Sequence, residues 1–209
     1  MQILPHLSRR VFIIALVLAG AVAFPLGAVD YPKEAERLAP LLNWQPGSVV
    51  ADIGAGGGEL ALAAAQRVGK TGRVYATELD AKKLAHLEDL AAKTDNITTL
   101  RAGAAQTNLP PECCDSIFMR LVYHHLTKPA EIDASLFRSL KPGGLLGLID
   151  QEPQPGSKMP EGVPENRGGH GVPEKIMIEE VTAAGFQVVK SFESWPDQHY
   201  CVIFRKPAA

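Results

Sequence analysis

The sequence predicts an α/β fold, a doubly wound, mostly parallel seven-stranded sheet with helices on both faces. After residue 30, short runs of β-branched and apolar residues alternate with longer segments of helical periodicity. This alternation is typical of parallel strands joined by crossover helices. Turns rich in glycine, such as 69–72 and 141–144, separate the segments and support the same division.

Each element follows from its own pattern. Helices are predicted where apolar residues recur at helical spacing, and strands where short apolar or β-branched runs are bounded by turn residues. The predicted helices are 32–42, 59–68, 81–93, 129–140 and 173–184. The predicted strands are 49–53, 73–78, 97–101, 116–120, 145–150, 186–192 and 200–205.

The first 28 residues have the pattern of a targeting segment. Arg9 and Arg10 precede an uncharged apolar run that extends to Val29. This layout is similar to a twin-arginine export signal, and Ala21-Val22-Ala23 offers a cleavage site. An uncleaved run of this length can instead anchor a chain in a bilayer. We therefore expect a signal peptide or membrane anchor over 1–28 and one domain over 29–209. The domain is expected to be exported, periplasmic or anchored facing outward, and cytoplasmic only if the segment is not a working signal.

The composition limits the classes of partner. The 209 residues carry a formal net charge of -2, and no basic stripe with interleaved aromatic residues is found. Nucleic-acid binding is therefore not expected. Contact with a membrane is expected only through the N-terminal segment, and the oligomeric state does not follow from the sequence. Three cysteines are too few for the disulfide framework of a small secreted protein.

The strongest functional signal is a glycine-rich turn between a strand and a helix. Asp52 stands near the end of the predicted strand, and Gly54, Gly56 and Gly58 follow at alternate positions, with Ala55 between the first two. Glycines let a ligand approach the backbone N–H groups at a helix start. Dinucleotide enzymes use a similar turn, but Asp52 would repel a pyrophosphate, whereas it can hold a cationic or amine-bearing cofactor.

A second acid stands at the end of the second predicted strand. Glu78 is placed so that its carboxylate can accept hydrogen bonds from both hydroxyls of a ribose. Asp80 is the competing candidate, but it precedes the next predicted helix and is expected to be its N-cap. Leu79, between the two acids, is expected at the same cofactor site.

Three runs of sequence resemble a known family: VADIGAGGGELALAAAQRVGKTGRVYATELD, LPPECCDSIFMRLVYHHL and SLKPGGLLGLID. From about residue 45 onward the chain resembles the class I, seven-stranded, Rossmann-like family of S-adenosylmethionine (SAM) dependent methyltransferases. The resemblance implies SAM as the cofactor, with its methionine part on the glycine loop, its ribose on the acid after the second strand, and the transfer site beside the end of the fourth strand. The cofactor-binding residues it implies are Asp52, Gly54, Ala55, Gly56, Gly58, Glu78, Leu79, Ala104, Ala105 and Arg120.

The sequence departs from the family at one element. Many relatives carry an aspartate after the third strand, where it contacts the adenine amino group, but Gly103-Ala104-Ala105 contains no acid. We expect backbone groups of Ala104 and Ala105, together with packing, to take over this contact.

Two segments carry candidate catalytic residues. Tyr123, His124 and His125 follow the fourth predicted strand and can supply a general base or hold the acceptor; alternatively, the histidines face the core and cap a turn. Arg167 and His170, flanked by glycines, lie in a long Pro- and Gly-rich stretch over 153–171. This stretch is interpreted as a lid that meets the acceptor, or alternatively as a mobile surface loop.

Other clusters receive weaker functional interpretations. His124, His125 and His170 could together hold a metal ion, but they lack the i, i+4 spacing of helical zinc ligands, so no metal is expected. Cys113 and Cys114 could bind a soft metalloid or be methylated; packing, or a strained vicinal disulfide, is the ordinary alternative.

The resemblance implies an enzyme that transfers a methyl group from SAM to a small-molecule acceptor, whose identity the sequence does not name. A non-catalytic SAM- or nucleoside-binding protein on the same fold is the alternative.

Overall fold

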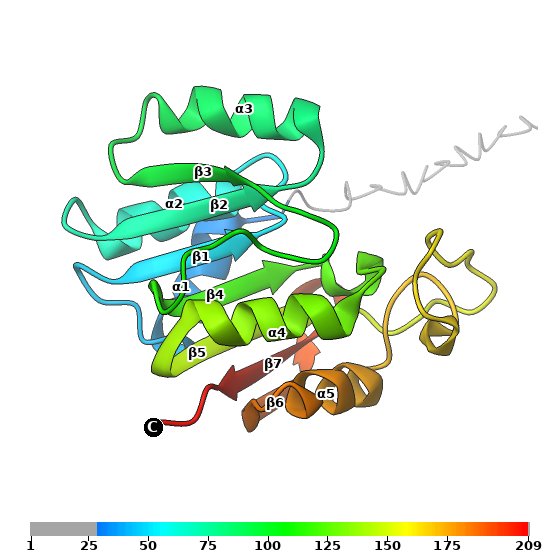
Figure 1. Ribbon diagram of the computed structural model, residues 1–209. Coiled ribbons are helices and arrows are strands. Elements are labelled where there is room, and N and C mark those ends of the chain that lie inside the picture. The colour runs from blue at the N-terminus through cyan, green and yellow to red at the C-terminus, as the bar shows by residue number, and fades with distance from the viewer. Residues whose placement is uncertain (1–28, 209) are drawn as a thin grey trace, which may run out of the picture.

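A seven-stranded sheet lies between two layers of helices in the computed structural model, which describes residues 29–208 (Figure 1). The strand order is β3-β2-β1-β4-β5-β7-β6. The strands are β1 (Val49–Ile53), β2 (Arg73–Glu78), β3 (Ile97–Arg101), β4 (Cys114–Arg120), β5 (Leu140–Asp150), β6 (Gln187–Trp195) and β7 (His199–Arg205). β1 to β5 pair in parallel, whereas β7 is antiparallel to both β5 and β6. The predicted fold class is confirmed.

The helices also follow the predicted pattern. They are α1 (Tyr31–Leu41), α2 (Glu59–Val68), α3 (Ala81–Ala91), α4 (Pro129–Ser139) and α5 (Glu174–Ala183), with short 3-10 turns η1 (Tyr123–His125), η2 (Glu165–Arg167) and η3 (Pro196–Gln198). Asp80 caps α3 by accepting hydrogen bonds from the backbone N–H groups of Lys82 and Lys83, both at 2.9 Å. Its predicted role as an N-cap is confirmed.

The strand β5 begins well before the predicted start at residue 145. The expected turn at 141–144 lies inside β5, which starts at Leu140 and pairs with Cys114 across an irregularity in the register. Gly143 allows this because it takes a φ of 78°, and its N–H donates to the carbonyl of Lys206. The chain therefore crosses this stretch as a bulged strand.

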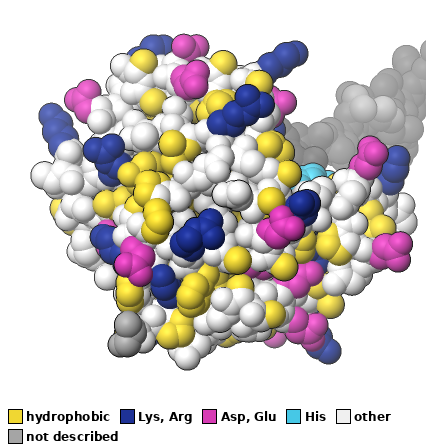
Figure 2. All heavy atoms as spheres, in the orientation of Figure 1, with side chains coloured by type: hydrophobic (Ala, Val, Ile, Leu, Met, Phe, Trp, Pro, Cys, Tyr) yellow, Lys and Arg dark blue, Asp and Glu magenta, His cyan; other side chains and the backbone are white. Residues whose placement is uncertain are grey.

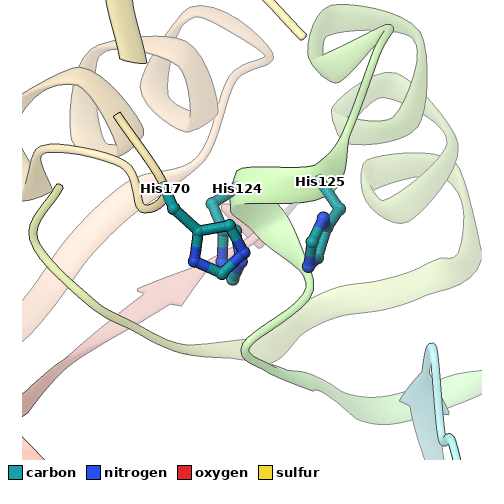
Figure 3. A group of neighbouring side chains, drawn as sticks. All are labelled: His124, His125 and His170. Carbon is teal, nitrogen blue, oxygen red and sulfur yellow. The ribbon is translucent and has the colours of Figure 1, made fainter. Parts of the chain in front are cut away.

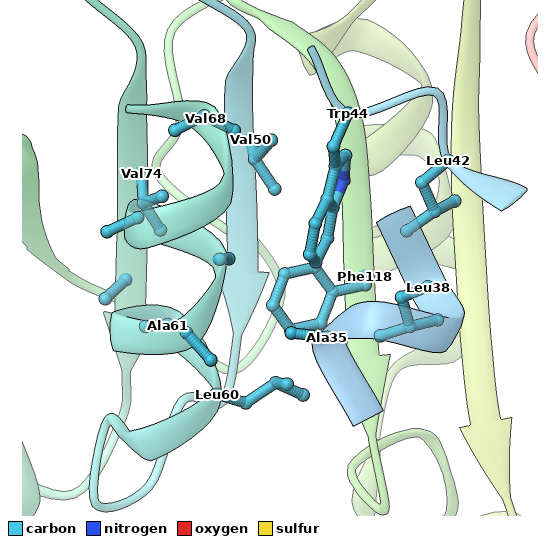
Figure 4. Close-up of a cluster of buried hydrophobic side chains, with 14 of the residues drawn as sticks. Ala35, Leu38, Leu42, Trp44, Val50, Leu60, Ala61, Val68, Val74 and Phe118 are labelled. Carbon is cyan, nitrogen blue, oxygen red and sulfur yellow. The ribbon is translucent and has the colours of Figure 1, made fainter. Parts of the chain in front are cut away.

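Two hydrophobic clusters fill the two faces of the sheet. Helices α1, α2 and α3 cover one face, where Trp44 packs on Phe118 with ring centroids 5.5 Å apart (Figure 4). The Trp44 indole N–H donates to the Ser116 hydroxyl at 2.9 Å, which satisfies the one polar group of this ring. Helices α4 and α5 cover the other face, where they bury Ile117 of β4 and Leu148 of β5. Alternate residues of β4 and β5 therefore face opposite layers, as a buried parallel sheet requires.

The topology determines where a ligand can bind. From β1 the chain continues to β2 on one side, and β4 lies on the other side of β1. Parallel strands end at a common edge, so Ile53, Glu78, Arg120 and Asp150 come from the ends of neighbouring strands. Open α/β sheets bind ligands at this edge, where the strand order reverses.

Other expectations concern the surface and the N-terminus. Among the coloured residues of Figure 2, positive and negative side chains are interspersed on the visible face and no patch of one sign stands out. No helix within residues 29–208 is both long enough and apolar enough to cross a membrane. The predicted targeting segment over 1–28 lies outside the described residues.

Candidate functional site

Two cavities lie at the carboxyl edge of the sheet. The larger has a volume of about 450 Å³ and lies at the ends of β1, β2 and β4. The smaller, about 120 Å³, lies against the glycine-rich turn, and it shares Gly54 and Arg120 with the larger. Because the two cavities share walls, they can hold different parts of one elongated ligand. Their combined volume is in the usual range for a cofactor site.

The glycine-rich turn forms a backbone cradle. Gly54 has a φ of 72°, and a Cβ there would lie 2.7 Å from the Val122 side chain. Gly58 has a φ of 86°, and a Cβ there would lie 2.6 Å from Leu87. Gly56 has a φ of 59° with open space above it. The turn therefore needs glycine for its conformation, and it leaves room for a ligand against the backbone.

Asp52 is a buried carboxylate in the smaller cavity. Its side chain is 3% exposed, and Oδ2 has no hydrogen-bond partner within residues 29–208. Burial, followed by the charges of Glu78 and Glu59, raises the pKa of Asp52 to about 8. A cationic group in the cavity would favour the ionised carboxylate and supply the missing partner. The site therefore fits a ligand that carries positive charge.

Glu78 is held rigidly at the end of β2. Its Oε1 accepts hydrogen bonds from the N–H groups of Leu79 at 2.8 Å and Asp80 at 3.0 Å, and its Oε2 accepts from Gly56 at 3.0 Å. These bonds link the acid to the glycine turn and aim it at the larger cavity, which it lines. Leu79 lines the same cavity and is 54% exposed, so it can pack against a ligand.

Arg120 supplies the opposite charge at the junction of the two cavities. Its guanidinium lies 3.4 Å from Glu34 and 3.6 Å from Asp197, and beside the ring of Tyr31. Tyr31 belongs to α1 and also lines the smaller cavity. No motif pointed to α1 as part of the site, because its contact with Arg120 exists only in the folded chain.

The loop after β3 differs in part from the expectation. Ala104 lines the larger cavity, but Ala105 lines a separate surface hollow. The loop turns between them, held by a hydrogen bond from the Gly103 N–H to the Gln106 carbonyl at 2.8 Å. Ala105 thus lines a different hollow from Ala104, and the backbone contact expected of Ala105 with the cofactor stays a prediction. Residues outside the quoted motifs also line the cavity: Lys83, Gln106 and Thr107.

The three candidate histidines meet in space (Figure 3). The ring of His124 lies 4.1 Å from that of His125 and 4.7 Å from that of His170, between centroids. His125 lines the larger cavity, whereas His124 is buried behind it. Desolvation, followed by His124 and His170, lowers the pKa of His125, which favours a neutral ring. The 3-10 turn η1 and the long loop after β5 thus bring together three histidines that lie in two separate segments of the sequence.

Tyr123 and Arg167 occupy a different environment from the one expected. Both are fully buried, and neither lines a cavity at the carboxyl edge. The Tyr123 hydroxyl donates to Asp133 at 2.8 Å, and burial raises its pKa above the usual value. Arg167 donates two hydrogen bonds of 2.8 Å to the Glu180 carboxylate. The predicted acceptor contacts of Tyr123 and Arg167 are corrected. The Tyr123 side chain joins η1 to α4, and the Arg167 side chain joins the loop after β5 to α5.

Cys113 and Cys114 are free thiols with sulfur atoms 3.0 Å apart. They lie at the start of β4, and the cavities lie at its other end.

Comparisons with known proteins agree with this geometry. Residues 51–148 match the family model described as a methyltransferase domain. The chain is 28% identical over 109 residues to the ubiquinone/menaquinone biosynthesis C-methyltransferase UbiE of Hydrogenovibrio crunogenus, which covers 51% of this chain and 43% of that protein. The corresponding protein of Paraburkholderia phymatum is 31% identical over 109 residues, covering 52% and 45%. The chain thus spans less than half the length of these two relatives.

A solved structure supports the fold. The SAM-dependent methyltransferase from Aquifex aeolicus superimposes with a TM-score of 0.72 at 21% identity, over 83% of this chain and 89% of that one. The matched sequence contains the glycine cradle and the strand ends that border both cavities. The chain is therefore similar to methyltransferase domains over residues 51–148, and it has the seven-stranded, Rossmann-like fold of the class I SAM-dependent methyltransferases.

Proposed function

We propose that this chain is an enzyme that transfers a methyl group from SAM to a small-molecule acceptor. One observation carries the proposal: Asp52, a buried carboxylate whose Oδ2 has no hydrogen-bond partner among residues 29–208, and the guanidinium of Arg120 line the same cavity beside the glycine cradle. An amino-acid zwitterion carries an ammonium and a carboxylate, so a site that binds it needs a negative and a positive side chain. The methionine part of SAM is such a zwitterion, so the site residues fit this cofactor.

Each side chain has a role in binding that follows from its charge. Asp52 is suited to accept hydrogen bonds from an ammonium group, and Arg120 is suited to pair with a carboxylate. Glu78 keeps acceptor capacity on both oxygens for a ribose diol. When bound, SAM supplies an electrophilic methyl group on a sulfonium sulfur. The protein then has to align the acceptor and exclude water.

The adenine end rests on a weaker set of contacts. Ala104 and its neighbours offer backbone groups, and Leu79 offers an exposed apolar surface in the larger cavity. No carboxylate stands at Gly103-Ala104-Ala105 to accept from the adenine amino group. Affinity for the cofactor should therefore depend mainly on Asp52, Arg120 and Glu78.

The acceptor is expected on the side of His125. This residue lines the larger cavity, which also has to hold the adenosine part of the cofactor, so the space left suits a small molecule. The UbiE relatives are named as C-methyltransferases of ubiquinone and menaquinone biosynthesis. Phenolic and quinone-like compounds therefore belong in the first acceptor panel.

Calorimetric titration of SAM, and of its demethylated product, into the full chain tests the cofactor. We expect binding in the micromolar range that Asp52→Ala and Arg120→Ala each weaken at least tenfold. His86→Ala is the matched control, because His86 is exposed on α3. Methyl transfer from labelled SAM to the acceptor panel then tests the reaction. Binding without turnover against any acceptor would favour a non-catalytic SAM-binding protein, and no binding would overturn the proposal.

We further propose that the domain acts outside the cytoplasm. The support is the arginine pair and apolar run of residues 1–28. Twin-arginine export moves folded proteins, so an enzyme already loaded with its cofactor can cross the membrane.

A further inference from the structure

Three imidazoles converge beside the larger cavity, from two segments far apart in the sequence (Figure 3). His124 and His125 come from η1 after β4, and His170 comes from the loop after β5. One ring nitrogen from each residue lies within 4.8 Å of the other two. The rings are tilted or edge-on to one another rather than stacked in parallel.

His124 is oriented as a metal ligand would be. Its Nδ1 lies 2.6 Å from Oδ1 of Asp150, and both side chains are buried. Asp150 is itself held, because it also accepts from the backbone N–H groups of His124 at 3.1 Å and Gln151 at 2.8 Å. The proton of His124 therefore belongs on Nδ1, and Nε2 presents a lone pair. A carboxylate behind a histidine is the usual second contact of a metal-bound imidazole.

The lone pair on Nε2 of His124 accepts no hydrogen bond from the described residues. Nε2 is buried and has no hydrogen-bond partner among residues 29–208. A buried acceptor without a partner destabilises the folded chain. A cation at this nitrogen would remove that destabilisation and would also compensate the buried charge of Asp150. This atom is the second, independent sign of a ligand at the cluster.

The loop after β5 is built to bring His170 to the cluster. The His170 N–H donates to the Ser157 hydroxyl at 2.8 Å, and the Gln151 amide contacts Nδ1 at 3.1 Å. A Cβ on Gly171 would lie 2.7 Å from the carbonyls of Gln151 and Glu152, so only glycine allows this close approach. The Gln151 amide N–H also donates to the carbonyl of His170 at 3.2 Å, so Gln151 holds both the ring and the backbone of His170 in place.

We infer that His124, His125 and His170 form a binding site for a first-row divalent transition-metal ion of the zinc class. Neutral imidazoles suit Zn²⁺, Ni²⁺, Cu²⁺ and Fe²⁺, whereas Mg²⁺ and Ca²⁺ prefer oxygen ligands. Tetrahedral coordination with bonds of about 2.0–2.1 Å separates ligand nitrogens by about 3.3 Å. The ligand nitrogens therefore have to approach by up to about 1.5 Å between the widest pair, a movement within reach of His125, which is exposed, and His170, which is partly exposed.

The position of the ion follows from the cavity walls. His125 lines the larger cavity, so the coordination position left open by three ligands would face that cavity. Three histidines and one open position are the pattern of catalytic rather than structural zinc sites. On the proposed function, the open position would hold an acceptor through a hydroxyl, carboxylate or thiol group.

Metal analysis of the full chain without a histidine tag tests the inference. The chain is first stripped with a chelator, then titrated with ZnCl₂ and, separately, MgCl₂, and its metal content is measured after dialysis. We expect one Zn²⁺ retained per chain and no Mg²⁺. His124→Ala and His170→Ala should each weaken Zn²⁺ binding at least tenfold, whereas His86→Ala should leave it unchanged.

Two outcomes would overturn the site. One is a full chain that retains no stoichiometric Zn²⁺, a result that needs no variant to fold. The other is Zn²⁺ binding that survives in both His124→Ala and His170→Ala, since the ion would then lie elsewhere. SAM titration of the metal-free chain is measured in parallel. A failure of the proposed function therefore appears as lost SAM binding with Zn²⁺ retained, and the two failures remain distinct.

Discussion

Four carboxylates lie at or beside the carboxyl edge of the sheet, and their surroundings give them different chemistry. Asp52 is buried without a full set of partners, whereas Glu78 accepts three backbone hydrogen bonds. Asp80 caps α3, and Asp150 orients His124. The carboxylate thus serves to bind a cationic group in Asp52, as a rigidly held hydrogen-bond acceptor in Glu78, as a helix cap in Asp80 and as a positioning group in Asp150. Burial and the available N–H donors decide which role each takes.

Replacing Asp52 by Asn should separate stability from binding. The folded chain keeps the Asp52 proton up to about pH 8, whereas an ordinary aspartate loses it near 3.8. Between these values the unfolded chain binds fewer protons, so the free energy of unfolding falls as pH rises. Asp52→Asn does not titrate and should melt at a higher temperature than the parent, by about 2–4 °C per kcal/mol gained.

The measurement is thermal unfolding of both proteins without cofactor, from pH 5 to pH 8, with SAM titration alongside. The stability gain of Asp52→Asn should grow across this range while its SAM affinity stays at least tenfold weaker. A gain that is the same at every pH would mean that Asp52 does not carry a raised pKa.

Glu78 and Asp80 form a matched pair at the end of β2. Glu78→Gln should weaken SAM binding about 10- to 100-fold, the loss expected when a hydrogen bond worth about 1.5–3 kcal/mol loses its charge. Asp80→Ala should lower the free energy of unfolding by about 1 kcal/mol, as the loss of an N-cap does, and leave SAM affinity unchanged. Calorimetry and denaturant unfolding measure both effects. Equal losses of affinity in the two variants would contradict the assignment of the ribose contact to Glu78.

At the scale of elements, the connection between β5 and α5 is the part that departs most from a simple α/β unit. It extends beyond the carboxyl ends of the strands (Figure 1). It is nonetheless anchored, since Arg167 pairs with Glu180 of α5 and Ser157 holds the backbone of His170. This connection therefore resembles an anchored segment more than a mobile surface loop.

Arg167→Ala should destabilise the connection between β5 and α5. Removing one partner of a buried ion pair costs about 3–5 kcal/mol, and the lower end applies because the Glu180 side chain is 20% exposed. We expect faster proteolysis within residues 153–171 and no change in SAM affinity. Glu180→Gln is the milder control, since it retains an acceptor for the guanidinium. Unchanged proteolysis and stability in Arg167→Ala would restore its interpretation as an acceptor-binding residue.

At the scale of the whole molecule, the proposed export depends on Arg9 and Arg10, which lie outside the described residues. Replacing Arg9 and Arg10 by Lys should abolish a twin-arginine signal while keeping the charge of the segment. Cell fractionation of the full chain should then find the parent outside the cytoplasm and the double variant inside. The same distribution for both chains would remove the export proposal and leave the fold and site unaffected.

The sequence by itself determined the order and type of nearly every element. Local patterns sufficed because most strands are buried runs bounded by turn residues, and because α1 and α3 carry side-chain caps, Asp30 and Asp80. It also determined the cofactor turn, since Gly54 and Gly58 are required by the positive φ of their own backbone. These features depend on neighbours in the chain, and so they can be read from short stretches of sequence.

Only the tertiary structure decided which distant side chains share an environment. Arg167 and His170 are three residues apart, yet one is buried against α5 and the other joins the histidine cluster. Glu34 reaches Arg120 across 86 positions of sequence because α1 packs over the sheet. Burial and charge pairing are properties of a packed interior, where the low dielectric strengthens each electrostatic contact. They come into existence only when the chain has folded and water has been removed.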